Sequence, residues 1–241
     1  MKIGILYGIS IGPGDPELIT LKGLRLLRTA DAIAFPAGAK GKPGLAQSII
    51  SPWSISQQKQ LPLHFPYVRD GEILTRAWQT AAETVWPYLA RGQNVAFACE
   101  GDISFYSTFT YLAQTLQQFH PEVVIEIVPG VSSPMAAAAA LGLPLTAREQ
   151  RLAILPAIYT IGELESVLGW ADAIVLMKVS SVYEQVWQLL KQHQLLDRAF
   201  AVERATLPEQ KIYPNLRDLP HLKLSYFSLL IIQVQKPARV S

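Results

Sequence analysis

The chain has 241 residues, a length that suits one large domain or two small ones. Half of the residues are apolar and 17% are charged, which excludes a largely disordered chain. The formal net charge is +2, and no run of Lys or Arg concentrates it, so we expect no nucleic-acid partner. The single cysteine, Cys99, rules out an intramolecular disulfide and favours a cytoplasmic location.

The chain begins with an apolar run that we interpret as the first strand and not as a signal peptide, because a glycine loop follows it directly. The longest apolar stretch, Met135 to Leu145, is shorter than the roughly 18 residues of a membrane span, so we expect no membrane partner. The four histidines form no close ligand pair, and we predict no metal site. The chain also contains no G-x-S-x-G motif, which removes support for a hydrolase.

Apolar runs of strand length alternate with segments of helical period, which is typical of an α/β protein with mostly parallel sheets. We predict a first domain over residues 1–146 and a second over residues 147–241. In chain order, the first domain has strands at 3–9, 32–35, 94–99 and 123–128 and helices at about 18–27, 70–92, 105–118 and 134–141. The second has strands at 152–155, 173–177, 199–203 and 226–234 and helices at 161–168 and 183–192. Residues 37–44 are predicted to be a mobile loop whose lysines reach a ligand.

Three loops rich in Gly, Pro and small polar residues, 12–16, 100–104 and 129–133, follow predicted strands of the first domain. Ligands of open α/β sheets bind outside the carboxyl ends of the strands, so one ligand can meet all three loops. The first loop matches neither a phosphate loop nor the dinucleotide fingerprint, and Asp15 would repel phosphate. The pattern therefore favours a ligand that carries positive charge or hydrogen-bond donors.

Taken singly, these residues leave alternatives open. The glycines of the first loop also suit a purely structural turn. The two carboxylates of Glu100-Gly101-Asp102 suit either helix capping by Asp102 or the binding of an ammonium group or ribose hydroxyls. Ser132 and Ser133 suit helix capping as well as a functional role. Met177, at the end of a predicted strand, suits a core position or the flat face of an adenine.

Read together, residues 8–22, 100–108 and 127–133 resemble the tetrapyrrole methylase family, whose members use S-adenosylmethionine in a cleft between two α/β domains. The second half, through residues 151–157, 175–179, 202–206 and 226–229, is most similar to the precorrin-2 C20-methyltransferases of cobalamin biosynthesis within that family. One position departs from the family pattern, because Ile103 stands where proline usually follows Gly-Asp. The departure puts the backbone of that loop in question.

The resemblance implies methylation of C20 of precorrin-2 or cobalt-precorrin-2, with S-adenosylhomocysteine as the second product, and a homodimer. It implies cofactor contacts from Pro13, Gly101, Asp102, Phe105, Ser132, Ser133, Met177 and Ala205. It also places the glycine loop, with Gly12 and Gly14, on the tetrapyrrole side of the cleft.

In a reduced tetrapyrrole the meso carbon C20 is nucleophilic, so the protein has to align it with the methyl group and accept one proton. We hypothesise that Asp15 orients the ring or receives the proton and that Tyr106 shapes the pocket. The substrate is a polycarboxylate, so we expect charge-assisted contacts from some of the cations near the inferred domain junction. These cations are Arg148, Arg151, Lys178, Arg204 and Lys211.

Two other functions remain open. The chain suits another transferase of the same family, one that methylates a different tetrapyrrole carbon, a diphthamide intermediate (diphthine) or ribosomal RNA. It also suits a non-catalytic tetrapyrrole carrier, which would bind the ligand without methyl transfer.

Overall fold

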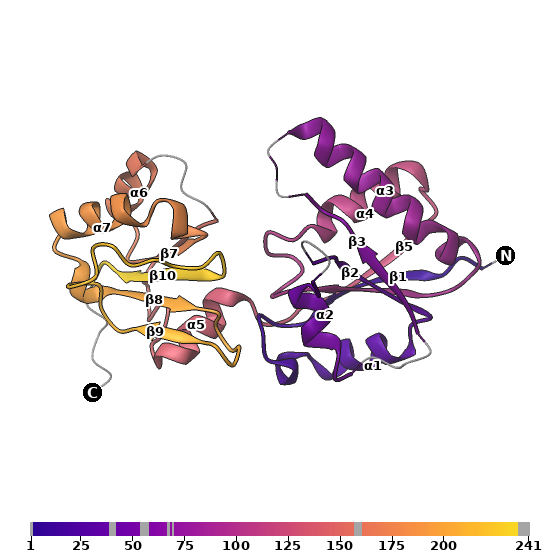
Figure 1. Cartoon of the computed structure of the whole chain (residues 1–241), viewed down its shortest axis with the longest axis horizontal. Coiled ribbons are helices and arrows are strands. Elements are labelled where there is room, and N and C mark those ends of the chain that lie inside the picture. Colours follow the sequence, from indigo (N-terminus) through magenta and orange to yellow (C-terminus); the bar gives the residue numbers. More distant parts are fainter. Residues whose placement is uncertain are drawn as a thin grey trace. The chain divides into compact units, whose positions relative to one another are not determined.

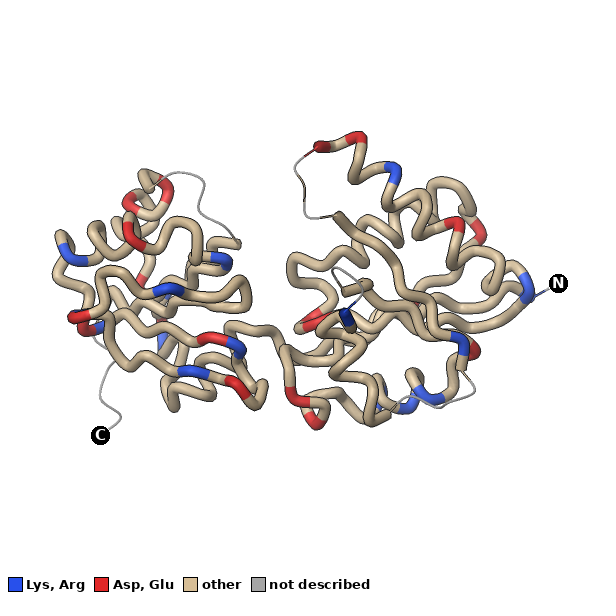
Figure 2. Tube along the Cα trace, viewed as in Figure 1, with Lys and Arg blue, Asp and Glu red and all other residues tan. Residues whose placement is uncertain are grey.

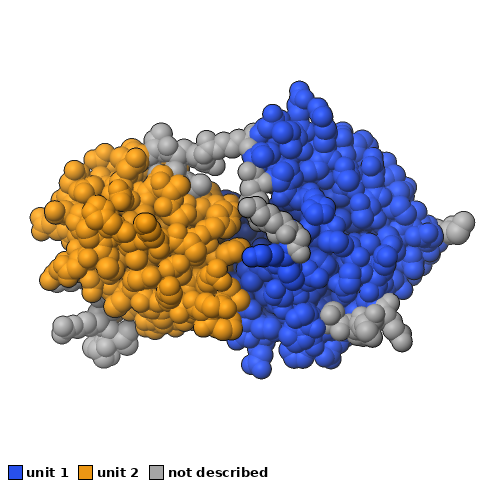
Figure 3. All heavy atoms as spheres, viewed as in Figure 1, with its two compact units in different colours: residues 1–132 blue, residues 133–241 orange. Residues whose placement is uncertain are grey.

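The computed structural model describes residues 2–38, 42–53, 58–66, 68, 70–156 and 161–235. The chain divides into two compact units, Met1–Ser132 and Ser133–Ser241, which Figure 3 colours separately. Each unit is built on one five-stranded sheet with helices packed on it (Figure 1). The predicted α/β class is confirmed.

The first sheet is entirely parallel, with the strand order β3-β2-β4-β1-β5. Its strands are β1 (Ile5–Ser10), β2 (Ala32–Pro36), β3 (Lys59–Leu63), β4 (Val95–Cys99) and β5 (Val124–Val128). The central strand β1 pairs with β4 on one side and with β5 on the other. The three glycine-containing loops therefore leave adjacent strands at one edge of the sheet, as predicted.

Helices cover both faces of this sheet (Figure 1). They are η1 (Pro16–Leu18), α1 (Leu21–Thr29), α2 (Leu45–Ile50), α3 (Gly71–Ala90) and α4 (Phe109–Phe119). The side chains of β4 alternate between the faces: Phe97 packs among residues of α3 and α4, whereas Ala96 and Ala98 pack among residues of α1 and α2. This alternation buries the strand completely and so fixes where its carboxyl end emerges.

The second sheet has the order β6-β7-β10-β8-β9. Its strands are β6 (Leu152–Leu155), β7 (Ala173–Met177), β8 (Ala199–Glu203), β9 (Lys211–Tyr213) and β10 (Ser228–Gln233). Helices α6 (Ile161–Leu168) and α7 (Tyr183–Gln192) pack with it in one apolar core. β6 and β7 pair in parallel, whereas β10 is antiparallel to both β7 and β8, and β9 is antiparallel to β8. The sheet is thus mixed, and not mostly parallel as the sequence analysis expected, because β10 inserts between β7 and β8.

Helix α5 (Ser133–Leu141) groups with the second unit, since it packs against β10. The sequence analysis placed this helix in the first domain, with the boundary at residue 146. Gly142, at a φ of +65°, ends the helix as predicted. Gly142 therefore marks the end of a helix inside the second unit and not a boundary between the two units.

Short elements account for the remaining differences. The sequence analysis did not predict α2, β3 or β9, whose lengths of six, five and three residues give little periodicity. The helix predicted from residue 105 begins at Phe109, because Tyr106 adopts a left-handed φ of +54° that breaks the helical path. Part of the loop predicted over 37–44 lies outside the described residues.

Among the described residues, no helix combines the length and the apolar character needed to cross a membrane. Lys and Arg are scattered among acidic residues over both units (Figure 2).

Candidate active site

The loops after β1 and β4 are joined by reciprocal backbone hydrogen bonds between two glycines. The Gly101 amide donates to the Gly12 carbonyl at 2.8 Å, and the Gly12 amide donates to the Gly101 carbonyl at 3.3 Å. Both residues have a left-handed φ, +76° at Gly12 and +70° at Gly101. A Cβ on Gly12 would also lie 2.9 Å from the Cβ of Leu18. Glycine at these positions thus lets the two loops approach closely.

The carboxylate of Asp102 ties this pair of loops to the loop after β5. Its Oδ2 accepts hydrogen bonds from the Gly130 amide at 2.7 Å and from the Ser10 hydroxyl at 3.4 Å. Its Oδ1 accepts from the Ser104 amide at 2.9 Å and from the Ser104 hydroxyl. A carboxylate has about four acceptor positions, so protein donors occupy all of them. Asp102 therefore serves the loops with its side chain, and its predicted cofactor contact is left to the main chain.

The hydrogen bonds at Asp102 also determine its ionisation. Desolvation raises the pKa of this carboxyl, but the hydrogen bonds from Ser104, Gly130 and Ser10 outweigh it, so the pKa lies below its ordinary value. The group is therefore negatively charged near neutral pH.

Glu100, two residues earlier, has a different environment. Its Oε1 accepts a hydrogen bond from the Ala46 amide in the first turn of α2, at 2.9 Å. Burial raises the pKa of Glu100, and the hydrogen bond from Ala46 lowers it by less. Glu100 thus connects α2 to the end of β4. The sequence left a capping role open for Asp102 and did not predict this contact of Glu100 with a helix distant in sequence.

Ile103 occupies the position at which proline usually follows Gly-Asp in the family that the sequence resembles. Its amide donates a 2.8 Å hydrogen bond to the Ser10 hydroxyl, whose own hydrogen is directed to Asp102. Proline lacks this N–H and could not make the bond. The Ile103 side chain is buried and lies where a Cβ on Gly8 would come within 2.7 Å of it. Isoleucine at position 103 thus adds a hydrogen bond to Ser10, and Ser10 in turn connects the loop to Asp102.

The aromatic residues predicted for this site follow directly. The rings of Phe105 and Tyr106 meet edge to face, with centroids 4.6 Å apart, and the Tyr106 side chain is 55% exposed. Ser107 then turns the chain into α4, because its hydroxyl accepts from the Phe109 amide at 3.0 Å. Tyr106 is therefore accessible at the surface of the first unit, and its role in shaping a pocket stays a hypothesis.

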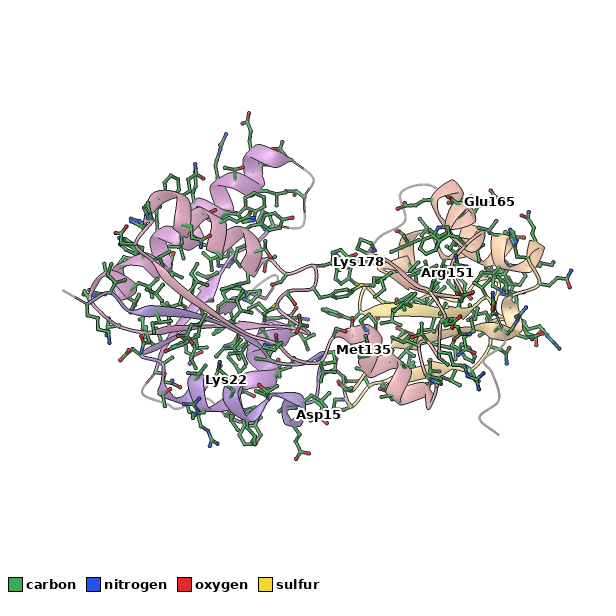
Figure 4. All side chains as sticks on the ribbon, turned by 180° about the vertical axis from the view of Figure 1, so that it is seen from behind. Asp15, Lys22, Met135, Arg151, Glu165 and Lys178 are labelled. Carbon is green, nitrogen blue, oxygen red and sulfur yellow. The ribbon has the colours of Figure 1, made fainter. Side chains whose placement is uncertain are left out.

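Asp15 and its neighbours lie at the same sheet edge. The Asp15 Oδ1 accepts a hydrogen bond from the Glu17 amide at 2.8 Å and so caps η1. Figure 4 labels Asp15 beside this short helix. Gly14 is buried, whereas Pro13 is partly exposed. Ser132 and Ser133, both partly exposed, mark the end of the first unit and the start of α5.

In the second unit, one sheet edge collects most of the predicted residues. β7 and β8 run in the same direction, since β10 lies antiparallel between them, so they end at the edge where β10 begins. Met177 is the last residue of β7, and Lys178 follows it. Arg204 and Ala205 follow β8, and Lys211 pairs with Glu203 at the start of β9. Met177, Lys178, Arg204, Ala205 and Lys211 thus share one edge.

Arg148 and Arg151 lie at the opposite edge, contrary to the expectation that they join the other cations. Arg151 precedes β6, whose first residue pairs with Ala173 at the start of β7. Its backbone amide and its Nε donate hydrogen bonds to the Asp172 carboxylate at 2.7 and 3.3 Å. The hydrogen bond from the amide is the main reason that the pKa of Asp172 is lowered. Figure 4 shows Arg151 and Lys178 apart from each other in this unit. Arg151 therefore stabilises the start of the sheet.

Sequence reasoning missed Ser10, Ser107 and Gly130 as the residues that shape the loops. Ser10 is fully buried at the end of an otherwise apolar strand, and a Cβ on Gly130 would lie 2.5 Å from the Ser10 Cβ. A lone serine in such a strand is the signal that was available, because a buried hydroxyl needs partners.

The donor set of the first unit suits a cationic ligand. The loops over residues 11–16, 100–108 and 129–132, all of them described, contain acidic residues but no Lys or Arg. Within the described residues, no three His, Cys, Asp or Glu side chains are grouped so that they could hold a metal ion. The loops therefore carry negative charge without a neighbouring Lys or Arg, while the acceptor positions of Asp102 are occupied by protein donors.

Comparisons with known proteins give the following matches. The model of the family Tetrapyrrole (Corrin/Porphyrin) Methylases matches residues 5–220. The cobalt-precorrin-2 C(20)-methyltransferase of Salmonella typhimurium is 34% identical over 233 residues, covering 96% of this chain and 97% of that protein. The precorrin-2 C(20)-methyltransferase of a Sinorhizobium species is 31% identical, covering 95% of both. The cobalamin biosynthesis protein CobIJ of Mycobacterium bovis is 35% identical over 237 residues, and the chain spans 46% of its length.

Solved structures share the fold. The X-ray structure of the cobalt precorrin-4 methyltransferase CbiF superposes with a TM-score of 0.72 at 24% identity, covering 96% of both chains. The uroporphyrin-III C-methyl transferase of Thermus thermophilus, complexed with S-adenosylhomocysteine, has a TM-score of 0.67 at 19% identity and covers 95% of this chain and 92% of that one.

We expect Asp102→Asn to destabilise the protein by roughly 1–3 kcal/mol at pH 7, because the amide cannot accept from all of the donors. The pKa of Asp102 is lowered in the folded protein, so the ionised carboxylate stabilises the fold at pH values above 3.8, the ordinary pKa of this group. This stabilisation is lost as the pH falls through the lowered pKa. Urea unfolding at pH 7 and pH 3 should therefore give a large difference from wild type at pH 7 and a smaller one at pH 3. Asp218→Asn, at an exposed carboxylate, is the matched control; an equal effect of the two substitutions would contradict the role of Asp102.

We expect Glu100→Gln to stabilise the protein at pH 8, because it removes a buried negative charge and keeps an acceptor for the Ala46 amide. The raised pKa favours the protonated carboxyl in the folded state, so ionisation destabilises the fold as the pH rises through that pKa. At pH values below 4.5, the ordinary pKa of a glutamate, the variant and wild type should have similar stability. Thermal unfolding across this range measures the difference, with the exposed Glu122→Gln as control; a gap that does not change with pH would argue against this prediction.

Proposed function

The chain belongs to the tetrapyrrole (corrin/porphyrin) methylase family, and we propose that it transfers a methyl group from S-adenosylmethionine to C20 of precorrin-2 or cobalt-precorrin-2. The observation that carries the proposal is the match to the Salmonella cobalt-precorrin-2 C(20)-methyltransferase over almost the full length of both chains. The name of the Sinorhizobium relative gives precorrin-2 without cobalt, so both forms of the substrate belong to the proposal.

The residues present fit the methyl donor. S-adenosylmethionine supplies an electrophilic methyl group on a positively charged sulfonium, and acidic loops without Lys or Arg suit such a cation. We propose that the first unit holds it through Pro13, the main chain of Gly101 and Asp102, Phe105, Ser132 and Ser133. In the second unit, Met177 and Ala205 are proposed to contact it, and their position at one sheet edge supports this assignment.

The protein's own work in this proposal is alignment, exclusion of water and proton transfer. Holding two reactants in line can remove ~7–11 kcal/mol of a barrier. Gly12 and Gly14 allow close approach of the tetrapyrrole, Tyr106 lines the pocket, and Asp15 orients the ring or accepts the C20 proton. Lys178, Arg204 and Lys211 are proposed to bind substrate carboxylates. Arg148 and Arg151 are not part of this group, since they lie at the other edge of their sheet.

A homodimer and a cytoplasmic location complete the proposal. β5 is an edge strand whose Val124 and Ile127 are 45% and 53% exposed, and apolar surface of this kind suits a contact with a second copy. Light scattering at micromolar concentration tests the dimer, and a monomer would contradict it.

The activity is tested by incubating the purified protein with S-adenosylmethionine and precorrin-2, metal-free and cobalt-loaded in parallel. We expect one added methyl group, located at C20 by mass and absorbance. Methylation of another carbon would move the chain to a different reaction of the family. Binding of the tetrapyrrole without methyl transfer would identify a carrier.

Asp15→Asn separates the proton-accepting role of Asp15 from its structural role. An asparagine oxygen can still accept from the Glu17 amide, so the cap on η1 should persist. We expect turnover to fall by roughly 100-fold, in the range of general acid–base catalysis, with cofactor affinity unchanged. Asp70→Asn, at the cap of α3, is the matched control. Full turnover of the Asp15 variant would exclude it as the base.

A further inference from the structure

Two aromatic residues stand exposed in the turn before β10. Tyr226 and Phe227 are 46% and 42% exposed, and their rings meet edge to face with centroids 5.4 Å apart. The turn lies at the edge where β10 begins, and this edge also carries Met177 and Lys178. Large apolar side chains placed together on a surface are typical of a binding site.

The turn that carries the two rings is held by polar contacts on several sides. The Ser225 amide donates to Glu203 Oε1 at 3.0 Å, and the Ser228 hydroxyl donates to the Ser225 carbonyl at 2.6 Å. The Arg204 amide donates to the Phe227 carbonyl at 2.7 Å. The Glu203 carboxylate also accepts a hydrogen bond from the Tyr213 hydroxyl at 3.1 Å, so both of its oxygens bind groups that hold this turn. The backbone therefore fixes both rings while leaving them half exposed.

A positive charge lies beside the rings. The Nζ of Lys178 is 5.9 Å from the centre of the Tyr226 ring, within the range of a cation–π contact. Lys178, Arg204 and Thr206, which follow the ends of β7 and β8, all have left-handed φ values, between +49° and +70°. Such conformations cost energy in residues other than glycine and collect at functional sites.

We propose that Tyr226, Phe227 and Lys178 form a recognition surface for the tetrapyrrole, in which the two rings pack against the macrocycle and the Lys178 ammonium binds one of its carboxylates. The inference rests on the proposed function, which makes a flat polycarboxylate the substrate. The Lys178 ammonium attracts a carboxylate and the two rings suit a flat macrocycle, so this surface fits the tetrapyrrole beside the methyl donor that is proposed to contact the neighbouring Met177. The three residues thus determine substrate specificity.

The test compares Tyr226→Leu, Phe227→Leu and Lys178→Gln with wild type. Each loss of a ring should raise KM for cobalt-precorrin-2 by roughly 3- to 10-fold. Loss of the ammonium should raise KM by about 10-fold. The dissociation constant for S-adenosylmethionine, measured by calorimetry, and kcat should stay within about 2-fold of wild type.

Two control variants are matched in chemistry. Trp170→Leu removes an aromatic side chain that is 45% exposed near the start of β7, at the opposite end of that strand. Lys191→Gln removes a lysine that lies 5.3 Å from the Trp187 ring on α7. Both should leave KM unchanged. Phe227→Tyr should restore most of the affinity lost in Phe227→Leu, and this rescue distinguishes contact with the ring from general damage to the turn.

Direct binding of cobalt-precorrin-2 to the wild-type protein distinguishes a failure of the recognition surface from a failure of the proposed function. If wild type binds it and all three variants bind equally well, the recognition surface is wrong and the proposed function stands. If the variants lose S-adenosylmethionine affinity instead, the rings serve the methyl donor and the inference is overturned. If wild type binds no tetrapyrrole, the proposed function fails, and the inference fails with it.

Discussion

The Asp102 carboxylate makes the hydrogen bonds on which the arrangement of the loops at the carboxyl edge of the first sheet depends. It accepts hydrogen bonds from residues at the ends of β1 and β5 and from its own loop after β4. Adjacent parallel strands bring these ends to one edge, but their loops still need a fixed relation to each other. An ionised carboxylate supplies it, because charge-assisted hydrogen bonds are stronger than neutral ones. The residues proposed to hold the methyl donor here are positioned around this one group.

The sequence predicted the ends of β1, β2 and β4 well, because strands that are largely buried on both faces are continuous apolar runs, whereas β3 was missed. It could not show which partners Asp102 has, since Gly130 lies 28 residues away and donates only a main-chain amide. The cations of the second unit show another limit. The parallel pairing of β6 with β7 puts Arg151 and Lys178 at opposite edges, and the insertion of β10 between β7 and β8 brings Arg204 and Lys211 to the edge of Lys178. Spacing along the chain carries no information on that pairing.

The two units differ in the charge that they present at these edges. The loops of the first unit carry Asp15, Glu100 and Asp102, whereas the edge of the second carries Lys178, Arg204 and Lys211. A cationic methyl donor and a polyanionic ring place opposite demands on a protein. The acidic loops of the first unit suit the proposed methyl donor, and the basic edge of the second unit suits the proposed polycarboxylate.

The hydrogen bond between the Ile103 amide and the Ser10 hydroxyl couples two positions that are far apart in the chain. A change to the more usual proline at 103 would leave the Ser10 hydroxyl short of a donor, so its effect depends on which residue stands at position 10. Sequence exchange at this loop is therefore epistatic. A loop with proline at position 103, transplanted into this chain, should function only when position 10 changes with it.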